Sequence, residues 1–310
     1  MIVTVTLNTA VDKLYLVDKL AVYTVMRVNR VSNTAGGKGL NVSKVAAIAG
    51  EPVTATGFVG GFNGRYVESM LKEQGVETRL THIAAETRSC INIREESTGR
   101  HTEFLEPGAA VTPEELERFW EDFCAASEGA KVVTISGSVP KGTPPDFYGR
   151  LIRYAKERGI RVLLDTSGQL LRDGAAARPT LIKPNTDEIE QLLGVPAKSE
   201  EELIAAAEKL RDGGIEIVVI SLGKDGALIA CRDGVFRGVT PDIPVVNTVG
   251  CGDSMVAGFA VGLSRGYSLP ETIRFAMAVS TANALTMETG YFKTEDLESL
   301  LGQVSVHKIK

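Results

Sequence analysis

The sequence predicts an α/β fold in which a mostly parallel sheet lies between two layers of helices, with a second, small β-sheet beside it. Short apolar runs alternate along the chain with segments of helical periodicity, the order expected of strand–helix–strand crossovers. Two other segments lack helical periodicity and alternate apolar with polar residues. With 310 residues, 44% of them hydrophobic, the chain is long enough to bury a sizeable core without disulfides or metals.

Central strands and helix starts are both recognisable. Thr112 and Ser199 each stand three residues before a glutamate, the capping-box pattern, and Pro113 takes the first helical position after Thr112. Gly213 is expected to end the helix that follows Ser199. Continuous apolar runs predict strands buried on both faces. These runs are Val132–Ile135, Val162–Leu164, Leu181–Ile182 and Ile217–Ile220.

Residues 11–31 and 87–107 are expected to leave this main domain and form a β-sheet lid. Both segments alternate apolar and polar side chains, which is typical of strands with one wet face. The apolar members are Met26, Val28, Ile91 and Ile93. The main domain then comprises residues 1–10, 32–86 and 108–310. The alternative interpretation is a pair of irregular surface hairpins.

Composition narrows the class of protein. A net charge of −5 weighs against a broad nucleic-acid-binding surface. The cysteines are scattered without a C-x-x-C pair, so we expect reduced thiols. No apolar stretch reaches the roughly 18 residues of a membrane span, and no basic residue precedes the first apolar run as in a secretory signal. We therefore expect a cytoplasmic protein with no nucleic-acid or membrane partner.

The segment Thr248–Ser254 combines two glycines with a carboxylate at a predicted helix start. Gly250 and Gly252 permit a tight turn and leave amide groups unobstructed. A helix N-terminus attracts anions such as a phosphoryl group. Asp253, in the first helical turn, is then placed to accept a proton from an attacking hydroxyl. The alternative is an ordinary glycine-rich turn with an aspartate cap.

A second polar segment, Lys183–Glu188, directly follows the predicted strand Leu181–Ile182. Open α/β sheets bind ligands at such strand ends. Asn185 and Glu188 offer oxygen ligands suited to a hydrated Mg²⁺ ion, and the lysine can pair with a nucleotide phosphate. The alternative is that Asn185 simply caps the following helix.

Three glycines, Lys38 and Asn41 precede a predicted helix over Val42–Ala49. The glycines allow a polar ligand to approach the backbone closely. The run is not a dinucleotide fingerprint, because Val42 stands where a third glycine is needed, and no Walker A loop occurs in the chain.

Two further features are weaker. Ser221–Ala227 follows a buried run and is either a nucleotide-facing loop or a hairpin turn. Asp12 follows the first apolar run and either holds sugar hydroxyls or belongs to a turn.

In this order, the motifs resemble the ribokinase-like (PfkB) carbohydrate kinases and are most similar to the branch of 1-phosphofructokinases and tagatose-6-phosphate kinases. The resemblance covers essentially the whole chain. The six collinear matches are T-L-N-T-A-V-D, G-G-K-G-L-N-V, S-G-S-V-P, K-P-N-T-D-E, S-L-G-K-D-G-A and T-V-G-C-G-D-S. The chain departs from the family at Thr9, usually proline, and at Cys251, usually alanine, although the second change leaves the backbone amide intact.

The resemblance implies a role for each matching position. Asp253 matches the catalytic base, and the amides of Gly250, Cys251 and Gly252 match the anion hole. The positions implied in the sugar-phosphate pocket are Asp12, Arg27, Gly37, Lys38, Asn41, Arg88 and Ser138. Those implied for ATP are Lys183, Asn185, Ser221, Gly223, Gly226 and Asn283, and those implied for Mg²⁺, through water, are Asn185 and Glu188.

The resemblance also implies an activity: an ATP- and Mg²⁺-dependent kinase that converts tagatose 6-phosphate or fructose 1-phosphate into the 1,6-bisphosphate. Glu86–Ile91 is more similar to the tagatose-6-phosphate kinases, which slightly favours that sugar. A homodimer through the lid sheet is implied as well, and a monovalent cation is a further candidate cofactor.

Three alternatives stay open at this stage. A kinase for an unphosphorylated sugar or nucleoside needs no cationic acceptor pocket, so Lys38 and Arg88 disfavour it. A non-catalytic sugar-phosphate sensor needs neither Asp253 nor metal ligands. A nicotinamide oxidoreductase is disfavoured by the missing third glycine.

Overall fold

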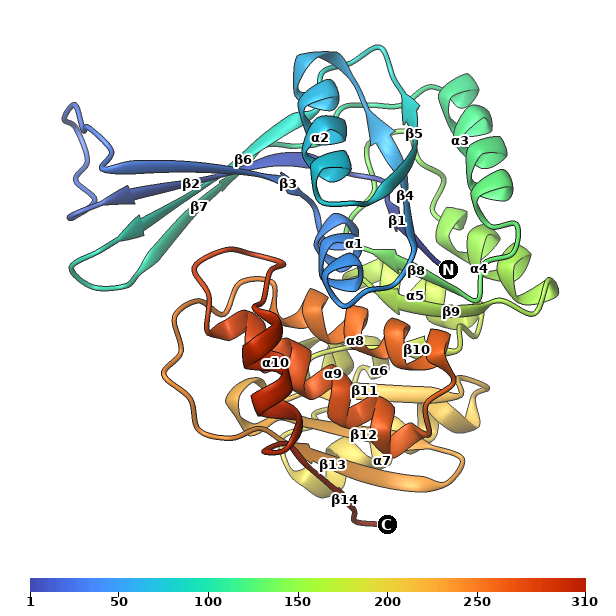
Figure 1. Ribbon diagram of the computed structural model, residues 1–310. Coiled ribbons are helices and arrows are strands. Elements are labelled where there is room, and N and C mark those ends of the chain that lie inside the picture. The colour runs from blue at the N-terminus through green and yellow to red at the C-terminus, as the bar shows by residue number, and fades with distance from the viewer.

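The computed structural model describes residues 1–310 as a main α/β domain from which a narrow sheet projects (Figure 1). Ten strands form the main sheet, in the order β14-β13-β12-β11-β10-β9-β8-β1-β4-β5. The strands from β11 to β5 in that order run parallel, and β12, β13 and β14 continue the sheet with antiparallel pairing. Their bounds are β1 (Ile2–Thr6), β4 (Val53–Val59), β5 (Glu77–His82), β8 (Val132–Ser136), β9 (Arg161–Asp165), β10 (Leu181–Ile182), β11 (Ile217–Ser221), β12 (Ala227–Cys231), β13 (Gly234–Val239) and β14 (Ser305–Lys308).

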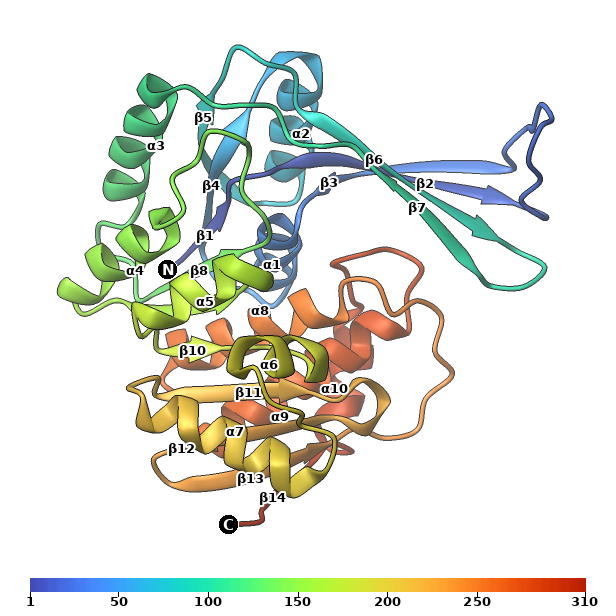
Figure 2. The ribbon, with the colours of Figure 1, turned by 180° about the vertical axis from the view of Figure 1, so that it is seen from behind.

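Helices cover both faces of this sheet, as Figures 1 and 2 show from opposite sides. Their bounds are α1 (Lys38–Ile48), α2 (Gly61–Glu73), α3 (Pro113–Ala126), α4 (Phe147–Glu157), α5 (Gly168–Ala176), α6 (Thr186–Leu193), α7 (Glu200–Asp212), α8 (Cys251–Arg265), α9 (Leu269–Ala284) and α10 (Thr294–Leu301), with a short 3₁₀ turn at Gly223–Asp225. One apolar core includes side chains from α1, α2, α8, α9 and α10, and the other includes side chains from α3 to α7. No helix is both long and apolar enough to cross a bilayer.

The two cores explain why the central strands are continuous apolar runs. Successive side chains of a strand point to opposite faces. In β9, Leu163 belongs to one core and Val162 and Leu164 to the other. The predicted strands at Val132–Ile135, Val162–Leu164, Leu181–Ile182 and Ile217–Ile220 all lie in the parallel part of the sheet. The predicted fold class is therefore confirmed.

The predicted helix starts also agree with the structure. Thr112 accepts a hydrogen bond from the Glu115 amide, and the Glu115 carboxylate accepts one from the Thr112 amide. Ser199 and Glu202 form the same reciprocal pair ahead of α7, and Gly213 follows its last residue.

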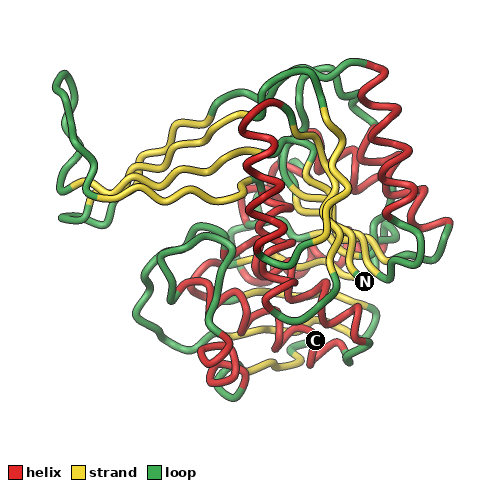
Figure 3. Tube along the Cα trace, turned by 45° about the horizontal axis from the view of Figure 1, so that its top comes forward, coloured by secondary structure: helices red, strands yellow, loops and turns green.

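The projecting sheet has four strands in the order β3-β2-β6-β7, and we call it the lid (Figure 3). They are β2 (Ala10–Val17), β3 (Arg30–Gly36), β6 (Arg88–Glu95) and β7 (His101–Leu105). The pair β2–β6 is parallel and the other two pairs are antiparallel.

One strand expectation for the lid was wrong. Met26 and Val28 alternate with polar residues, yet they lie in the loop that joins β2 to β3. No strand pairs with this loop. Its end is held instead by the side-chain amide of Asn29, which donates hydrogen bonds to the carboxylates of Asp18 and Glu96. Strand β3 continues to Gly36, whereas the first lid segment was expected to end at residue 31.

Gly37 is the single residue between β3 and α1. Its φ of 106° lies in the region that favours glycine. A Cβ atom there would stand 2.8 Å from the Thr6 side chain. The lid therefore joins the first turn of α1 without a linker.

Candidate active site

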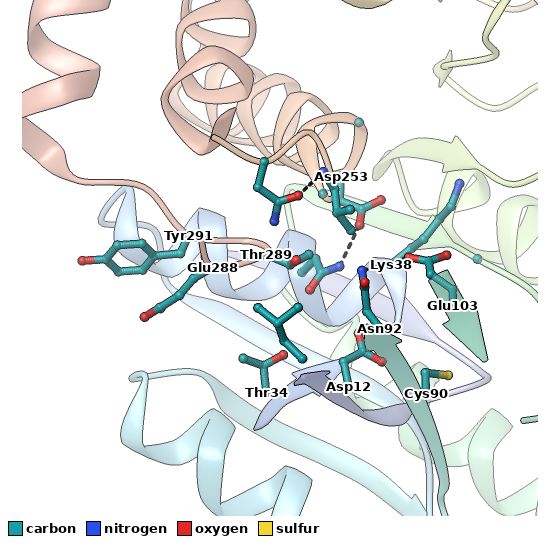
Figure 4. A pocket seen from close by; sticks show the side chains of 18 of the residues that line it. Asp12, Thr34, Lys38, Cys90, Asn92, Glu103, Asp253, Glu288, Thr289 and Tyr291 are labelled. Carbon is teal, nitrogen blue, oxygen red and sulfur yellow. Dashed lines mark hydrogen bonds between the residues drawn. The ribbon is translucent and has the colours of Figure 1, made fainter. Parts of the chain in front are cut away.

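A cavity of about 1060 Å³ lies where the lid, the carboxyl ends of the parallel strands and the N-termini of α1 and α8 meet. Figure 4 shows polar side chains from the lid, from α1 and from α8 around it. This is the edge at which open α/β sheets bind ligands. The predicted site residues that line it are Asp12, Gly37, Lys38, Asn41, Arg88, Ser138, Lys183, Asn185, Glu188, Ser221, Gly250, Gly252 and Asp253.

Asp253 lies in the first turn of α8 and is only 7% exposed. The Asn41 amide, from α1, donates a 2.8 Å hydrogen bond to Oδ2 of this carboxylate (Figure 4). Burial and the charge of Asp165 raise the pKa of Asp253 to about 6, against the opposing effects of Lys38 and Asn41. The group is mainly a carboxylate at neutral pH, which suits a general base.

The backbone before Asp253 forms an open helix N-terminus. Gly250 has a φ of 82° and caps α8. The N–H groups of Gly250, Gly252 and Asp253 donate to no backbone acceptor, as expected of a first helical turn. The Cys251 amide, in contrast, donates to the Thr248 carbonyl at 3.2 Å. The structure thus removes Cys251 from the predicted set of free anion-binding amides and adds the amide of Asp253.

Two lysines flank a buried carboxylate on the wall of the cavity. Nζ of Lys183 lies 3.2 Å from Oδ1 of Asp165, and Nζ of Lys38 lies 3.6 Å from its Oδ2. Burial lowers the pKa of Lys38, but the carboxylates of Asp165, Asp253 and Glu188 outweigh it and raise that pKa overall. Lys38 therefore remains charged, and the two lysine side chains can hold phosphate groups.

Asn185 and Glu188 cap α6 with a reciprocal pair of hydrogen bonds. The Asn185 side chain accepts from the Glu188 amide at 2.8 Å, and Oε2 of Glu188 accepts from the Asn185 amide at 2.9 Å. The helix-cap alternative is therefore what the structure shows. The cap leaves the second carboxylate oxygen of Glu188 free, whereas the two oxygens of the buried Asp165 face the ammonium groups of Lys183 and Lys38. These oxygens have the chemistry that Mg²⁺ prefers.

Asp12 extends from β2 of the lid toward the same cavity (Figure 4). Burial raises its pKa, although the cations of Lys44 and Arg88 and the Gly37 amide act in the opposite direction. A carboxylate in such a position can accept hydrogen bonds from sugar hydroxyls.

Arg88 is anchored by backbone carbonyls at the base of the lid. Its Nη1 donates to Glu106 O at 2.9 Å and its Nη2 to Asn8 O at 3.1 Å, while Nε has no partner. The Asn8 amide in turn donates to the Ser138 hydroxyl at 3.0 Å. The guanidinium is thereby fixed in orientation at the cavity wall.

Some predicted residues do not reach the cavity. Arg27 is exposed in the loop between β2 and β3, and Arg30, the first residue of β3, lines the cavity instead. Gly223 and Gly226 belong to the turn that joins β11 to β12, and only Ser221 of that loop faces the cavity. A Cβ at Gly226 would lie 2.1 Å from a carbonyl of β13, so this glycine serves the hairpin.

Asn283 is completely buried and stabilises the start of α8 through hydrogen bonds. Its Oδ1 accepts hydrogen bonds from the Ser254 hydroxyl and from the Gly290 and Tyr291 amides. Its amide donates to the Val249 carbonyl. The predicted direct contact with ATP is therefore corrected to a supporting role at the start of α8.

Comparison with known proteins agrees with this geometry. The sequence pattern of the pfkB family carbohydrate kinases matches residues 3–296. The chain belongs to this family. It is 39% identical over 312 residues to a tagatose-6-phosphate kinase of Staphylococcus epidermidis, with 100% of both chains covered. The predicted family resemblance is thereby confirmed.

Solved structures of Escherichia coli phosphofructokinase-2 share the fold of this pfkB kinase. The complex with potassium has a TM-score of 0.92 and 28% identity. The complex with fructose-6-phosphate has a TM-score of 0.90 and 28% identity. Each comparison covers 97% of this chain and 98% of the other.

Several cavity residues of this pfkB kinase were not predicted from the sequence. Asp165 follows the predicted strand Val162–Leu164 directly, and that position was the available signal. Asn92 and Glu103 face the cavity from β6 and β7 and hydrogen-bond each other at 3.2 Å. Lys44, a buried lysine on α1 that does not line the cavity, was not predicted either, because its helical spacing from Asn41 gave no sign of a role.

Proposed function

We propose that this pfkB kinase transfers the γ-phosphoryl group of ATP to a ketohexose monophosphate, giving the 1,6-bisphosphate. The acceptor is tagatose 6-phosphate or fructose 1-phosphate, with tagatose 6-phosphate slightly favoured. The observation that carries the proposal is the buried carboxylate of Asp253, which sits at an open helix N-terminus in the cavity that Lys38 and Lys183 also line. The identity to a tagatose-6-phosphate kinase supports the choice of acceptor.

The acceptor hydroxyl would lie against Asp253. Its carboxylate takes the hydroxyl proton as the oxygen attacks phosphorus, while the Asn41 amide keeps the carboxylate in one orientation. The amides of Gly252 and Asp253 donate to the phosphoryl oxygens and stabilise the charge that builds up on them. Positioning and charge neutralisation supply most of the rate acceleration in such transfers.

The sugar phosphate would lie between the lid and α1. Asp12 accepts hydrogen bonds from sugar hydroxyls, and Asn92 and Glu103 offer further partners on the lid. Arg88 and Lys38 provide positive charge for the acceptor's phosphate. A kinase for an unphosphorylated sugar would have no need of this charge.

The nucleotide would lie on the opposite wall, against Lys183, Asn185 and Ser221. Mg²⁺, when bound with ATP, offsets the charge of the phosphates. The free carboxylate oxygen of Glu188 is the protein group that fits it, since the carboxylate of Asp165 already faces Lys38 and Lys183. No three His, Cys, Asp or Glu side chains gather around one point, so phosphate and water would supply most of its ligands.

A monovalent cation and a dimer are the finer parts of the proposal. One Escherichia coli phosphofructokinase-2 structure contains potassium, and the segments around Asn247 and Ala284, where we would seek such a cation here, are hydrogen-bonded to each other.

The lid exposes apolar side chains, among them Val31 at 49% and Phe104 at 57%. Covering these by a second copy of the chain would give a homodimer, which the molar mass in solution tests.

One assay separates the candidate activities. ADP release is followed with Mg²⁺-ATP and five acceptors in parallel: tagatose 6-phosphate, fructose 1-phosphate, fructose 6-phosphate, ribose and adenosine. The highest kcat/KM is expected with tagatose 6-phosphate or fructose 1-phosphate, with Asp253→Asn as the inactive control. A preference for ribose or adenosine would overturn the assigned acceptor class, and no turnover with any acceptor would overturn the kinase proposal.

A further inference from the structure

Lys44 is a buried lysine that the proposed mechanism does not use. It lies on α1, one helical turn after Asn41, and is only 2% exposed. Its ammonium makes one hydrogen bond, of 3.1 Å, to the carbonyl of Thr289. A buried charge is costly unless compensating groups surround it, so this position calls for an explanation.

Three carboxylates from three different elements compensate the charge. They belong to Asp12 on β2, Asp253 on α8 and Glu288 in the segment after α9. Burial lowers the pKa of Lys44 to about 8 in spite of these carboxylates. The side chain is therefore mainly charged at neutral pH and interacts electrostatically with both the predicted sugar ligand and the predicted base.

The carbonyl that Lys44 binds belongs to residues 286–291, which we call the backing segment. Met287, Glu288, Thr289 and Tyr291 of this segment line the cavity, and the last three are labelled in Figure 4. The segment follows α9 and has no helix or strand of its own to hold it. Its conformation therefore depends on individual hydrogen bonds.

Those hydrogen bonds reach the backing segment from three directions. Asn283 accepts from the amides of Gly290 and Tyr291 at 3.0 and 3.3 Å. The Asn247 amide donates to the Met287 carbonyl at 3.1 Å. Lys44 supplies a hydrogen bond from the side of α1, through a charged donor, which is the stronger kind.

The backing segment packs directly against Asn41. A Cβ atom at Gly290 would lie 3.0 Å from both Cβ and Oδ1 of Asn41. The Oδ1 atom of Asn41 has no hydrogen-bond partner. Packing against Gly290, rather than a second hydrogen bond, therefore fixes the Asn41 side chain. Any movement of the segment away from α1 would free the amide that holds Asp253.

We propose that Lys44 is a positioning residue for phosphoryl transfer. Its ammonium binds the backing segment to α1 and thereby keeps the Asn41 amide on the carboxylate of Asp253. This inference rests on the proposed kinase function, because its consequence is a correctly placed base. It also makes a claim about the backing segment that does not depend on catalysis.

The test compares two variants of Lys44. Lys44→Met keeps the length of the side chain but removes its charge and its hydrogen-bond donors, whereas Lys44→Arg retains both. An exposed lysine on α2, changed as Lys72→Met, is the matched control. For Lys44→Met, kcat is expected to fall about 10- to 100-fold, the size of effect that small misplacements produce, with the KM for ATP little changed. Lys44→Arg should restore most of the loss, and the control should match the wild type.

Hydrogen exchange of the backing segment provides a readout besides activity. Exchange at residues 286–291 is expected to be faster in Lys44→Met and near normal in Lys44→Arg, with melting temperatures recorded for each. A near-normal kcat in Lys44→Met, unchanged exchange, or a well-folded Lys44→Arg as slow as Lys44→Met would each overturn the inference. Should Lys44→Met not fold, Lys44→Gln is measured in the same way. If the wild type were inactive with every acceptor, the proposed function would be overturned. The hydrogen-exchange result would still decide whether Lys44 holds the backing segment.

Discussion

The hydrogen bond from Asn41 to Asp253 gives the most direct test of how the base is tuned. Asn41→Ala removes a donor 2.8 Å from Oδ2 and leaves the carboxylate in place. That donor lowers the pKa of Asp253, which burial and Asp165 raise to about 6. Its loss should therefore raise the pKa further, so that more of the base is protonated at neutral pH.

The size of the effect follows from the energy of such a contact. A hydrogen bond to a charged group is worth roughly 1.5–3 kcal/mol, and about 1.4 kcal/mol corresponds to one pH unit. The acid limb of the kcat profile should move upward by about one to two pH units. At pH 7 the carboxylate fraction would fall from about nine-tenths to between about a half and a tenth, and kcat would fall about two- to tenfold with it.

The assay is ADP release at saturating sugar phosphate and ATP, measured for both proteins across the acid and neutral range. Gln169→Ala is the matched control, because Gln169 donates a 2.7 Å hydrogen bond to the carboxylate of Asp173 and neither residue lines the cavity. Its profile should match that of the wild type. An acid limb that stays in place in Asn41→Ala would refute the assignment of this amide to the base.

Three further outcomes are expected. Asp253→Asn should lower kcat at least about 100-fold, as loss of a general base does, while ATP affinity measured by titration stays the same; near-normal turnover would exclude Asp253 as the base. Arg88→Ala should raise the KM for the sugar phosphate far more than the KM for ATP, and equal increases would contradict its place in the acceptor pocket. Phe119→Ala should lower the free energy of unfolding in urea by about 3–5 kcal/mol. The Phe119 ring is fully buried, and its centroid lies 5.0 Å from that of Phe58 and 6.0 Å from that of Phe147. A smaller loss would mean that neighbouring side chains can collapse into the space left by the ring.

The main domain could be predicted because its signals are local. A strand covered on both faces is an uninterrupted apolar run, and Ile217–Ile220 has this property because its side chains alternate between the two cores. The capping boxes at Thr112 and Ser199 likewise depend on residues three positions apart.

The lid was predicted less well, since alternation does not reveal whether a partner strand is present. Ile91 and Ile93 lie on β6, which pairs on both sides with β2 and β7. Met26 and Val28 have a similar pattern but no neighbouring strand. Pairing over long distances in the chain decided between them.

In the site, the sequence predicted which segments converge better than which side chains face the cavity. Asp253 could be predicted because glycine spacing and helix start coincide around it. The family resemblance implied that Asn283 contacts ATP, yet its side chain is completely buried and does not line the cavity. Asp165 was missed because a single carboxylate after a strand acquires meaning only when Lys38 and Lys183 approach it from other elements.

The absence of a linker at Gly37 has a mechanical consequence. The sheet that would close over the sugar and the helix that carries Lys38 and Asn41 are joined by one peptide unit on each side of this glycine. Bending the sheet toward a bound sugar must therefore rotate the first turn of that helix. Contacts between the lid and the sugar, far from the reacting hydroxyl, would in this way help to align the proton acceptor Asp253. Binding energy from remote parts of a substrate can thereby raise the rate of the reaction and not only the affinity for the substrate.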